Sequence, residues 1–352
     1  MALAQLVADD FRCLRHVELA LAPRLNLVWG ENGAGKTSIL EAAFLLGRGR
    51  SFRTRLSERL IRQGADRLVV FGRTDTVPEH AAGIEVSKEG GTRGRLDGRN
   101  VESLAELSAA VSVQVIDPEI HKLIEQGPER RRRWLDWLVF HVEPEFGGTW
   151  SRYTRCLRQR NAALRSQGHS TAAWDAELIA TGVELAEART RVLDRLRPFW
   201  DVTAAQLSSL APSMSMSRGW AQEMSFAEAL SGAAERDRQR GSTTVGPHRM
   251  DLHLRVHGKP ARDVLSRGQQ KLVAASMVIA QLKLLRQELE LRPLLLLDDP
   301  AAELDDSRLE AFVAEIAALD CQMLVTSLRS ETRLFGTPDR VFHVEQGSLE
   351  RV

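Results

Sequence analysis

Residues 30–37, with the sequence GENGAGKT, have the spacing G-x-x-x-x-G-K-[ST] of a phosphate-binding loop. Glycines in such a loop let the backbone curl so that successive N–H groups point at phosphate oxygens, and the following helix N-terminus adds partial positive charge. We expect Lys36 to reach the β- and γ-phosphates of a nucleotide and Thr37 to offer its hydroxyl to Mg²⁺. The predicted nucleotide-binding residues are Gly30, Glu31, Asn32, Gly33, Ala34, Gly35, Lys36, Thr37 and Ser38.

Two adjacent carboxylates follow the aliphatic run LLLL at 294–297. Such a run suits a strand buried on both faces of a parallel sheet, and α/β sites lie at the carboxyl ends of such strands. Asp298 would then hold Mg²⁺, directly or through water, and Asp299 would orient or deprotonate an attacking water. Taken alone, the pair is better explained as a helix N-cap. Together with the loop at 30–37, it favours metal-assisted phosphoryl transfer.

A third stretch, LSRGQ at 265–269, places a hydroxyl, a glycine and an amide at the start of an expected helix. Ser266, Gly268 and Gln269 could bind an anion there, because a helix N-terminus presents free N–H groups and partial positive charge. The alternative is a plain N-cap at Ser266, which would be favoured if this stretch stood alone.

The elements that must position these residues alternate between strand and helix patterns. Strands are expected before Gly30 and a helix over 36–47, followed by short strands and hairpin turns between 67 and 114. Helical periodicity dominates from about 119 to 235 and predicts an inserted pair of antiparallel helices, without a heptad pattern long enough for an extended coiled coil. Strands and helices alternate again from about 250, which indicates an α/β architecture.

Composition is that of a globular protein, with 43% hydrophobic and 27% charged residues over 352 positions. The net charge is +1, and 42 of the 48 basic residues are arginine, so no single arginine run is strong evidence of nucleic-acid binding. Cys13, Cys156 and Cys321 are far apart, which suits a reducing cytosol. Charges interrupt the N-terminal residues as they would not in a signal peptide, and the LLLL run is too short to span a bilayer.

LSRGQ resembles the LSGGQ signature of ABC-type ATPases, with Arg267 in place of the first glycine. AAELDD at 301–306 resembles their D-loop, with Asp305 as its acid. In that family two heads dimerise head to tail, and each signature binds the γ-phosphate held by the other head. The resemblance therefore implies an ATP-dependent homodimer with two composite sites.

Other motifs resemble the RecF family of bacterial recombination-repair proteins, which are SMC-like ATPase heads without long coiled coils. The resemblance spans nearly the whole chain and rests on FR at 11–12, VIDPEIHKLIEQGPERRRRWLD at 115–136, HVEPEF, LRQRNAALR and TVGPHRMDL. It implies slow ATP hydrolysis used as a dimerisation switch, and binding of double-stranded and single-stranded DNA at gap junctions. It also implies action with RecR, and with RecO, in loading the recombinase RecA.

The resemblance also assigns individual residues. It implies catalytic roles for Lys36 and Asp299, and it places Gln114 at the Q-loop as a further nucleotide and Mg²⁺ ligand. Two positions depart from the ABC pattern. Most ABC-type ATPases have glutamate where Asp299 stands, and LVTSLRSE lacks their switch histidine, leaving Thr326 or Ser327 as candidates to sense the γ-phosphate.

A DNA-binding face is expected from the same resemblance. Arg131 and Arg132 match the family's arginine pair, and His248 and Arg249 lie just before the signature. A solvated helix end or internal ion pairs would explain the arginines equally well, and bracing of the signature segment would explain the other two residues equally well. Phosphate contacts rather than base contacts would suit a protein that recognises the shape of a junction.

These observations predict an α/β ATPase head of the ABC/SMC type, with a P-loop α/β lobe, an antiparallel β lobe and an inserted helical domain. The expected domains are 1–118 and 243–352 for the ATPase and 119–242 for the insertion. The predicted function is that of a cytoplasmic DNA-repair ATPase that does not bind membranes. The alternatives are the ATPase subunit of a membrane transporter and a clamp that binds ATP without hydrolysing it.

Overall fold

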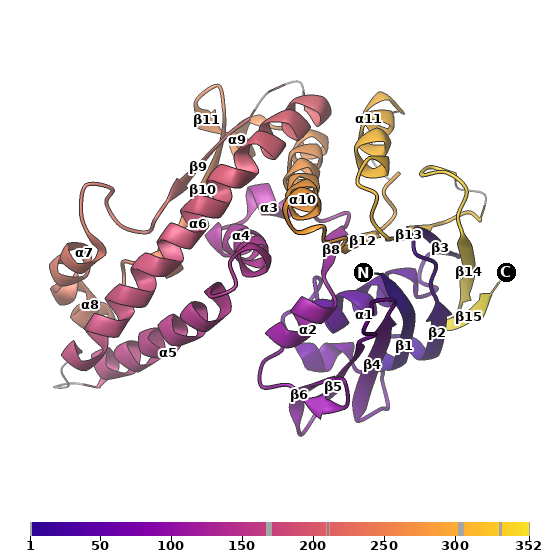
Figure 1. Cartoon of the computed structure of the whole chain (residues 1–352), viewed down its shortest axis with the longest axis horizontal. Coiled ribbons are helices and arrows are strands. Elements are labelled where there is room, and N and C mark those ends of the chain that lie inside the picture. Colours follow the sequence, from indigo (N-terminus) through magenta and orange to yellow (C-terminus); the bar gives the residue numbers. More distant parts are fainter. Residues whose placement is uncertain are drawn as a thin grey trace. The chain divides into compact units, whose positions relative to one another are not determined.

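The computed structural model describes residues 2–166, 171–208, 210, 212–301, 306–330 and 333–351. Contacts divide the chain into two units, whose elements Figure 1 labels. Unit 1 comprises Met1–Ile120 and Ala275–Val352, and unit 2 comprises His121–Ala274. The predicted α/β class is confirmed, since unit 1 combines a largely parallel sheet with an antiparallel one.

Unit 1 is built from two six-stranded sheets. The antiparallel sheet has the order β2-β1-β4-β5-β6-β7, and the second sheet has the order β15-β14-β3-β13-β12-β8, in which β15 runs antiparallel to β14 and the other neighbours are parallel. The strands are β1 (Leu3–Phe11), β2 (Leu14–Ala20), β3 (Leu25–Trp29), β4 (Arg67–Thr74), β5 (Ala81–Ser87), β6 (Gly91–Leu96), β7 (Arg99–Asn100), β8 (Val113–Ile116), β12 (Leu294–Leu297), β13 (Met323–Ser327), β14 (Arg340–Glu345) and β15 (Ser348–Arg351). The helices are α1 (Lys36–Arg48), the short 3₁₀ helix η1 (Ser57–Leu60), α2 (Ala105–Ala110), α11 (Asp306–Ala317) and the second half of α10 (Arg267–Leu289).

Helix α1 lies between the two sheets and is buried on nearly all sides. It contacts β1, β4 and β5 of the antiparallel sheet and β8, β12 and β13 of the other sheet. A helix that is apolar around most of its circumference, as KTSILEAAFLLG is, requires such a position. The four leucines of β12 are likewise buried on both faces, as expected for a central parallel strand. The loop before α1 is therefore held by the main hydrophobic core of unit 1.

Unit 2 is mainly helical, with a small antiparallel sheet of order β11-β10-β9. Its elements are α3 (Lys122–Glu125), α4 (Pro128–Val142), α5 (Phe146–Arg165), α6 (Ala172–Leu207), β9 (Ser213–Ser217), α7 (Phe226–Gly232), α8 (Ala234–Arg240), η2 (Pro247–Arg249), β10 (Asp251–Val256), β11 (Lys259–Pro260), α9 (Ala261–Val264) and the start of α10. Helices α5 and α6 pack against each other (Figure 1), and ion pairs from Arg152 to Glu184 and from Arg160 to Asp175 show that they run antiparallel.

The two contact-based units begin and end at other residues than the expected domains. The first division falls after residue 120 rather than 118, and the second falls inside α10, after residue 274 rather than 242. Residues 243–274 belong to unit 2 because β10 pairs with β9 and packs on α4. Helix α2 and the hairpin β14–β15 were not anticipated. None of the helices in the described residues has the length and apolar composition needed to cross a membrane.

Candidate nucleotide-binding site

The loop from residue 30 to residue 35 connects β3 to α1, and its glycines are required by close packing. Gly30 has a φ of 155°, and a Cβ there would lie 2.2 Å from the carbonyl oxygen of Val344 on β14. Gly35 has a φ of 118°, and a Cβ there would lie 2.9 Å from the side chain of Leu14. Because β14 and the β1–β2 hairpin enclose the loop, side chains at these two positions would displace it.

Lys36 lies in the first turn of α1 with its ammonium group folded into the loop. Its Nζ donates hydrogen bonds to the carbonyl oxygens of Gly30 at 2.7 Å and Glu31 at 2.8 Å. Burial lowers the pKa of Lys36, while the charges of Asp299 and Asp298 raise it. The loop therefore contains a buried cation with two carboxylates nearby.

A threonine and a carboxylate meet next to this cation. Thr37 Oγ1 donates to Asp298 at 3.0 Å from Oδ1 and 3.1 Å from Oδ2. Asp298 follows β12, and β13 separates β12 from β3 in the sheet. The sheet thus places the P-loop threonine and the first acid of the pair at the same edge, as sites at the carboxyl ends of parallel strands require.

The intervening strand β13 contributes Thr326 to this arrangement. Its hydroxyl donates to Asp298 Oδ1 at 2.9 Å and accepts from the backbone N–H of Asp299 at 2.9 Å. Ser327 acts through its backbone, since its carbonyl oxygen accepts from the N–H of Gly30 at 3.3 Å. Thr326 and Ser327 were the two candidates to take the place of the switch histidine. Thr326 holds the acid pair, and Ser327 holds the P-loop.

Asp299 turns sharply away from β12. Its φ is 47°, a left-handed conformation that costs a non-glycine residue roughly 1–2 kcal/mol. Burial and the neighbouring charge of Asp298 raise the pKa of Asp299, whereas Lys36 lowers it. A raised carboxyl pKa next to a phosphate-binding loop is a property expected of a group that accepts a proton.

A pocket of about 540 Å³ opens beside Thr37 and Asp298, a size typical of small-molecule sites. Three of its lining residues are arginines, which suits an anionic ligand. Besides Thr37 and Asp298, the lining residues are Arg12, Phe52, Arg53, Thr54, Arg59, Asp117, Pro118 and Glu119. Sequence reasoning missed the arginines of this wall, since it used Arg12 only as a family motif.

Glu41 holds part of that wall in place. It is fully buried on α1, and its carboxylate accepts hydrogen bonds from Arg12 Nε at 3.0 Å and Arg12 Nη2 at 2.9 Å. The hydroxyl of Ser51 donates to the same carboxylate, and Arg53 Nη1 lies 3.7 Å from it. One buried carboxylate thus connects the P-loop helix to two arginines that line the pocket.

The structure does not bring Gln114 into this pocket. Its side-chain amide donates to Gln281 at 2.7 Å in the core of unit 1, and its backbone pairs with Leu295 within the sheet. The strand ends at Ile116, so Asp117 is the residue that leaves the strand at the site. Gln114 therefore does not line this pocket, whereas Asp117, which directly follows β8, does, and a role for Gln114 as a nucleotide and Mg²⁺ ligand stays a prediction.

The signature residues cap α10. The backbone N–H of Ser266 donates to Gln269 Oε1 at 2.8 Å, and the N–H of Gln269 donates to Ser266 Oγ at 3.4 Å, a reciprocal capping box. Ser266 is exposed, and Gly268 lies in the first turn. Two other predicted site residues lie elsewhere in the chain. The hydroxyl of Ser38, on α1, lies 3.7 Å from Cys13 Sγ. Asp305 lies outside the described residues.

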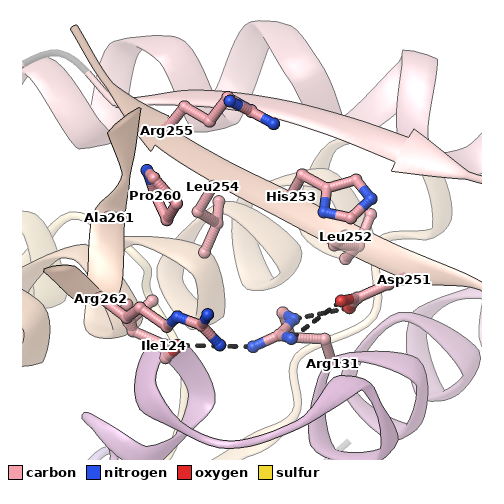
Figure 2. A pocket seen from close by; sticks show the side chains of 10 residues that line it. All are labelled: Ile124, Arg131, Asp251, Leu252, His253, Leu254, Arg255, Pro260, Ala261 and Arg262. Carbon is pink, nitrogen blue, oxygen red and sulfur yellow. Dashed lines mark hydrogen bonds and ion pairs between the residues drawn. The ribbon is translucent and has the colours of Figure 1, made fainter. Parts of the chain in front are cut away.

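Most of the predicted DNA contacts are internal braces. Figure 2 shows the fork of Arg131 bonded directly to the carboxylate of Asp251, at 2.8 and 3.0 Å, and both residues line a cavity of about 240 Å³. Arg131 is buried, and its Nη1 also donates to three backbone carbonyls. Arg132 donates to the carbonyl oxygen of Met250 at 2.6 Å, and burial lowers its pKa. Both arginines therefore brace unit 2 through internal bonds, and their contact with DNA stays a prediction.

In the second predicted pair, His248 is held by internal bonds and Arg249 is exposed. His248 bonds Tyr153 Oη at 2.6 Å and the carbonyl oxygen of Thr243 at 3.0 Å, and burial lowers the pKa of His248 to about 4. It is therefore neutral at physiological pH and cannot attract a phosphate through its charge. Arg249 is exposed and donates one long bond of 3.3 Å to Thr243, so it is the member of the four that faces solvent.

Comparison with known proteins finds similarity over the whole chain. The family model described as "RecF/RecN/SMC N terminal domain" matches residues 2–349. Proteins called "DNA replication and repair protein RecF" are similar in Shewanella baltica (strain OS223), at 38% identity over 99% of both chains, and in Pectobacterium atrosepticum, at 39% over 99% of this chain and 98% of that protein.

Solved structures share the fold. A structure of "the recombination mediator protein RecF-ATP in RecFOR pathway" superposes with a TM-score of 0.89 at 24% identity, covering 99% of this chain and 97% of that one. An Smc head domain from Pyrococcus furiosus, bound to the C-terminal domain of ScpA, gives a TM-score of 0.59 at 17% identity, covering 99% and 95%. At these identities the likeness concerns the fold alone, and it confirms the expected ATPase-head architecture.

Proposed function

The chain belongs to the RecF branch of the RecF/RecN/SMC family, and on this premise we propose that it is an ATP-dependent DNA-binding protein of recombination repair. The observation that supports this most directly is the joining of Thr37 to Asp298 at the P-loop, with Lys36 beside them. That arrangement is the one that a nucleotide triphosphate and its metal ion require.

The donor set fits ATP with Mg²⁺. Thr37 and Asp298 would hold the ion, which prefers oxygen ligands and keeps waters and substrate phosphates in its coordination sphere. Among the described residues no cluster of three or more histidine, cysteine or acidic side chains could hold a metal alone, so the phosphates would complete the site. Bound there, Mg²⁺ would neutralise charge on the β- and γ-phosphates. Arg12 and Arg53 give the neighbouring wall the charge that suits the rest of an anionic nucleotide.

Hydrolysis needs few further groups. Asp299 orients a water and takes its proton as the water oxygen attacks the γ-phosphorus. The bond to the β–γ bridging oxygen breaks, which releases ADP and phosphate. Lys36 offsets the charge on the transferred group and on the leaving oxygen. Aspartate is one methylene shorter than the glutamate common in ABC-type ATPases, which suits slow turnover and the use of ATP as a switch.

Dimerisation would complete the site. Ser266, Gly268 and Gln269 lie at the exposed start of a 23-residue helix, where a γ-phosphate held by a second copy could bind. Two copies related by a twofold axis would form two composite sites, each with the P-loop of one copy and the signature of the other. DNA would then bind most tightly to the ATP-bound homodimer.

The proposed substrate is DNA in which duplex meets a single-stranded gap. RecR, together with RecO, is the proposed protein partner in loading RecA there, in the cytoplasm. The transporter alternative has no support from the relatives. They match this chain over nearly their full length, and they are named as DNA replication and repair proteins. Phosphate release measured with DNA present separates the ATPase from a clamp that does not hydrolyse ATP.

Sedimentation of the full chain, with and without ATP, tests the switch. The parent should dimerise with ATP, and gapped duplex should strengthen this. Lys36→Ala should lose tight ATP binding, while Ser266→Arg should bind ATP and remain monomeric, because its bulk occupies the place of the opposite γ-phosphate.

Mixing the two variants is the sharper control. A heterodimer can close one composite site, formed by the intact P-loop of one chain and the intact signature of the other. ATP-dependent dimers should therefore reappear in the mixture. If Ser266→Arg alone dimerises normally, the signature does not act across a dimer, and the proposal of composite sites is wrong.

A further inference from the structure

The exposed side of α5 is the feature of unit 2 that the site described above does not use. The helix contains five arginines and no aspartate or glutamate. Arg160 is buried against Asp237 and Asp175, and Arg152 lies near Glu184 at 3.4 Å. The remaining three, Arg155, Arg158 and Arg165, are exposed, and they are called the α5 arginine face below.

The three residues lie on one side of the helix. Residues three or seven positions apart on an α-helix share a face, and the spacing from Arg155 to Arg158 to Arg165 is three and then seven. The opposite side of α5 packs inward through Tyr153, Cys156 and Ala163. From Arg155 to Arg165 the face extends roughly 15 Å along the helix, at about 1.5 Å per residue.

The arginines of this face lie together and, among the described residues, have no acidic partner. In the part of the chain that the structure describes, no carboxylate forms an ion pair with Arg155, Arg158 or Arg165. Elsewhere in unit 2, several exposed arginines do have an acidic neighbour. Examples are Arg191 and Arg195 with Glu143, Arg197 with Asp194, Arg238 with Glu235 and Arg262 with Asp263. Arg155, Arg158 and Arg165 therefore present their charges to solvent along one side of a helix that carries no acidic residue.

Two more exposed arginines lie beside the C-terminal half of α5. Helix α8 contacts α5 and ends at Arg240, and Arg165 packs against Gly241, where an added Cβ would lie 3.1 Å from its Cγ. Thr243 then joins Arg249 to the same helix: its carbonyl oxygen accepts from Arg249, and its N–H donates to Asn161 at 2.7 Å. The basic surface therefore continues from α5 onto the segment 240–249.

We infer that the α5 arginine face, extended by Arg240 and Arg249, is the surface of unit 2 that binds the phosphates of duplex DNA. The inference rests on the proposed function and specifies a DNA surface other than Arg131, Arg132 and His248, whose side chains form bonds within unit 2. Duplex DNA carries a charge about every 1.7 Å of its axis, so a face roughly 15 Å long meets several phosphates on each strand. Arginine forks suit phosphate oxygens, and such contacts position a duplex without reading its sequence.

The test compares three variants of the full chain in the presence of ATP. One carries Arg155→Ala, Arg158→Ala and Arg165→Ala, and the second carries lysine at the same positions. The third is a matched control with Arg67→Ala, Arg73→Ala and Arg99→Ala, which removes three exposed arginines from the antiparallel sheet of unit 1, where each has a glutamate partner. Binding of a labelled duplex is followed by fluorescence anisotropy over a series of salt concentrations. ATP binding, measured separately, reports whether each variant is folded.

The alanine variant should bind ATP normally and bind duplex at least roughly tenfold more weakly at low salt. Its plot of log affinity against log salt should be shallower by about 2 to 3, since each lost contact removes roughly 0.9 from the slope. The lysine variant and the control should keep the slope of the parent. If the alanine variant keeps the affinity and slope of a DNA-binding parent, the face is wrong while the proposed function stands. A parent that binds no DNA overturns both.

Discussion

The second acid of the pair, Asp299, separates nucleotide binding from chemistry at the scale of one residue. Asp299→Asn keeps the size of the side chain and removes its charge, while Thr37 and Asp298 remain joined. We therefore expect ATP to bind about as tightly as in the parent and hydrolysis to fall by roughly 10²-fold or more, the range of a lost general base. Nucleotide affinity and single-turnover phosphate release measure the two effects. Parallel losses in both would contradict this division of roles.

The same residue sets the acidic limb of the pH profile. Burial and the charge of Asp298 raise the pKa of Asp299 above the ordinary 3.8, so on acidification it takes up a proton, and stops accepting one from water, at a higher pH than an ordinary aspartate does. Phosphate release should therefore fall as the pH drops through that raised value, and the Asn variant should lose this limb.

Glu41 acts on the site through the residues it holds. Glu41→Gln preserves volume but leaves the guanidinium of Arg12 without its charged partner and weakens the hold on Arg53. We expect the KM for ATP to rise roughly tenfold, equivalent to about 1.4 kcal/mol, with a smaller change in kcat. Glu58→Gln, an exposed change in the adjoining η1, is the control. An unchanged KM would mean that the arginine wall does not contact nucleotide.

Residue roles could be predicted where they follow from a continuous pattern. Lys36 and Thr37 lie within one motif, and Asp298 ends an aliphatic run, so local sequence is enough to suggest their chemistry. Arg131 could not be placed in this way, because its partner Asp251 is 120 positions away. Gln114 illustrates the same limit: its side chain lies in the core, whereas Asp117, three residues later and just beyond β8, lines the pocket.

At the scale of elements, the close approach of α6 to α7 is set by one glycine. A Cβ at Gly182 would lie 2.4 Å from the ring of Phe226 and 3.3 Å from Tyr153. Gly182→Ala should therefore destabilise unit 2 by roughly 1–3 kcal/mol through overpacking, despite a better helix propensity. Gly148→Ala in α5, where no atom lies within 4 Å, should be neutral or stabilising by up to about 1 kcal/mol. Urea unfolding followed by tryptophan fluorescence checks both. Equal effects would contradict the packing argument.

The short helix η2 is held by a histidine that must remain neutral. His248 has a pKa of about 4 in the folded protein and an ordinary value of 6.5, so between these values the unfolded chain binds more protons. The free energy of unfolding of unit 2 should therefore decrease as the pH falls from about 6.5 towards 4. Between pH 7 and pH 5, the parent should lose about 2 kcal/mol more than His248→Gln. Identical pH dependence in the two proteins would show that His248 is not buried neutral.

Elements differ in how clearly the sequence indicates them. The helix after Gly35 and the strand LLLL were predictable because burial on all sides leaves an uninterrupted apolar pattern. The hairpin β14–β15 was missed because RVFHVE and SLER carry polar residues on both sides of the strand. Strand β14 is an inner strand of the sheet only because it also pairs with β3, which is far away in the sequence. Helix α2 is six residues long, too short for its period to stand out within a strand-rich region.

At the scale of the molecule, the two units differ in continuity. Unit 2 is one segment, whereas unit 1 is assembled from two segments on either side of it. A fragment of residues 121–274 should therefore unfold cooperatively in urea when expressed alone. Residues 1–120 alone should not, because β3 would lack β13 and β14, and β8 would lack β12. Circular dichroism and the sharpness of the urea transition measure this. A cooperative transition in 1–120 would contradict the division.

The position of β3 between β13 and β14 constrains how the protein can be made on the ribosome. Asn26, near the start of the strand that leads to the P-loop, donates to the carbonyl oxygen of Met323, a residue translated 297 positions later. While the chain grows, β3 therefore stays without its partner strands. Unit 2, which is a single segment, is synthesised and can fold in the meantime. Exposed strand edges invite association with other nascent chains, and such distant pairings form slowly. Translation that stalls before Met323 would therefore release a chain with a folded unit 2 and an incomplete, aggregation-prone sheet. Chaperones and proteases would be expected to recognise the exposed strand edges of that sheet.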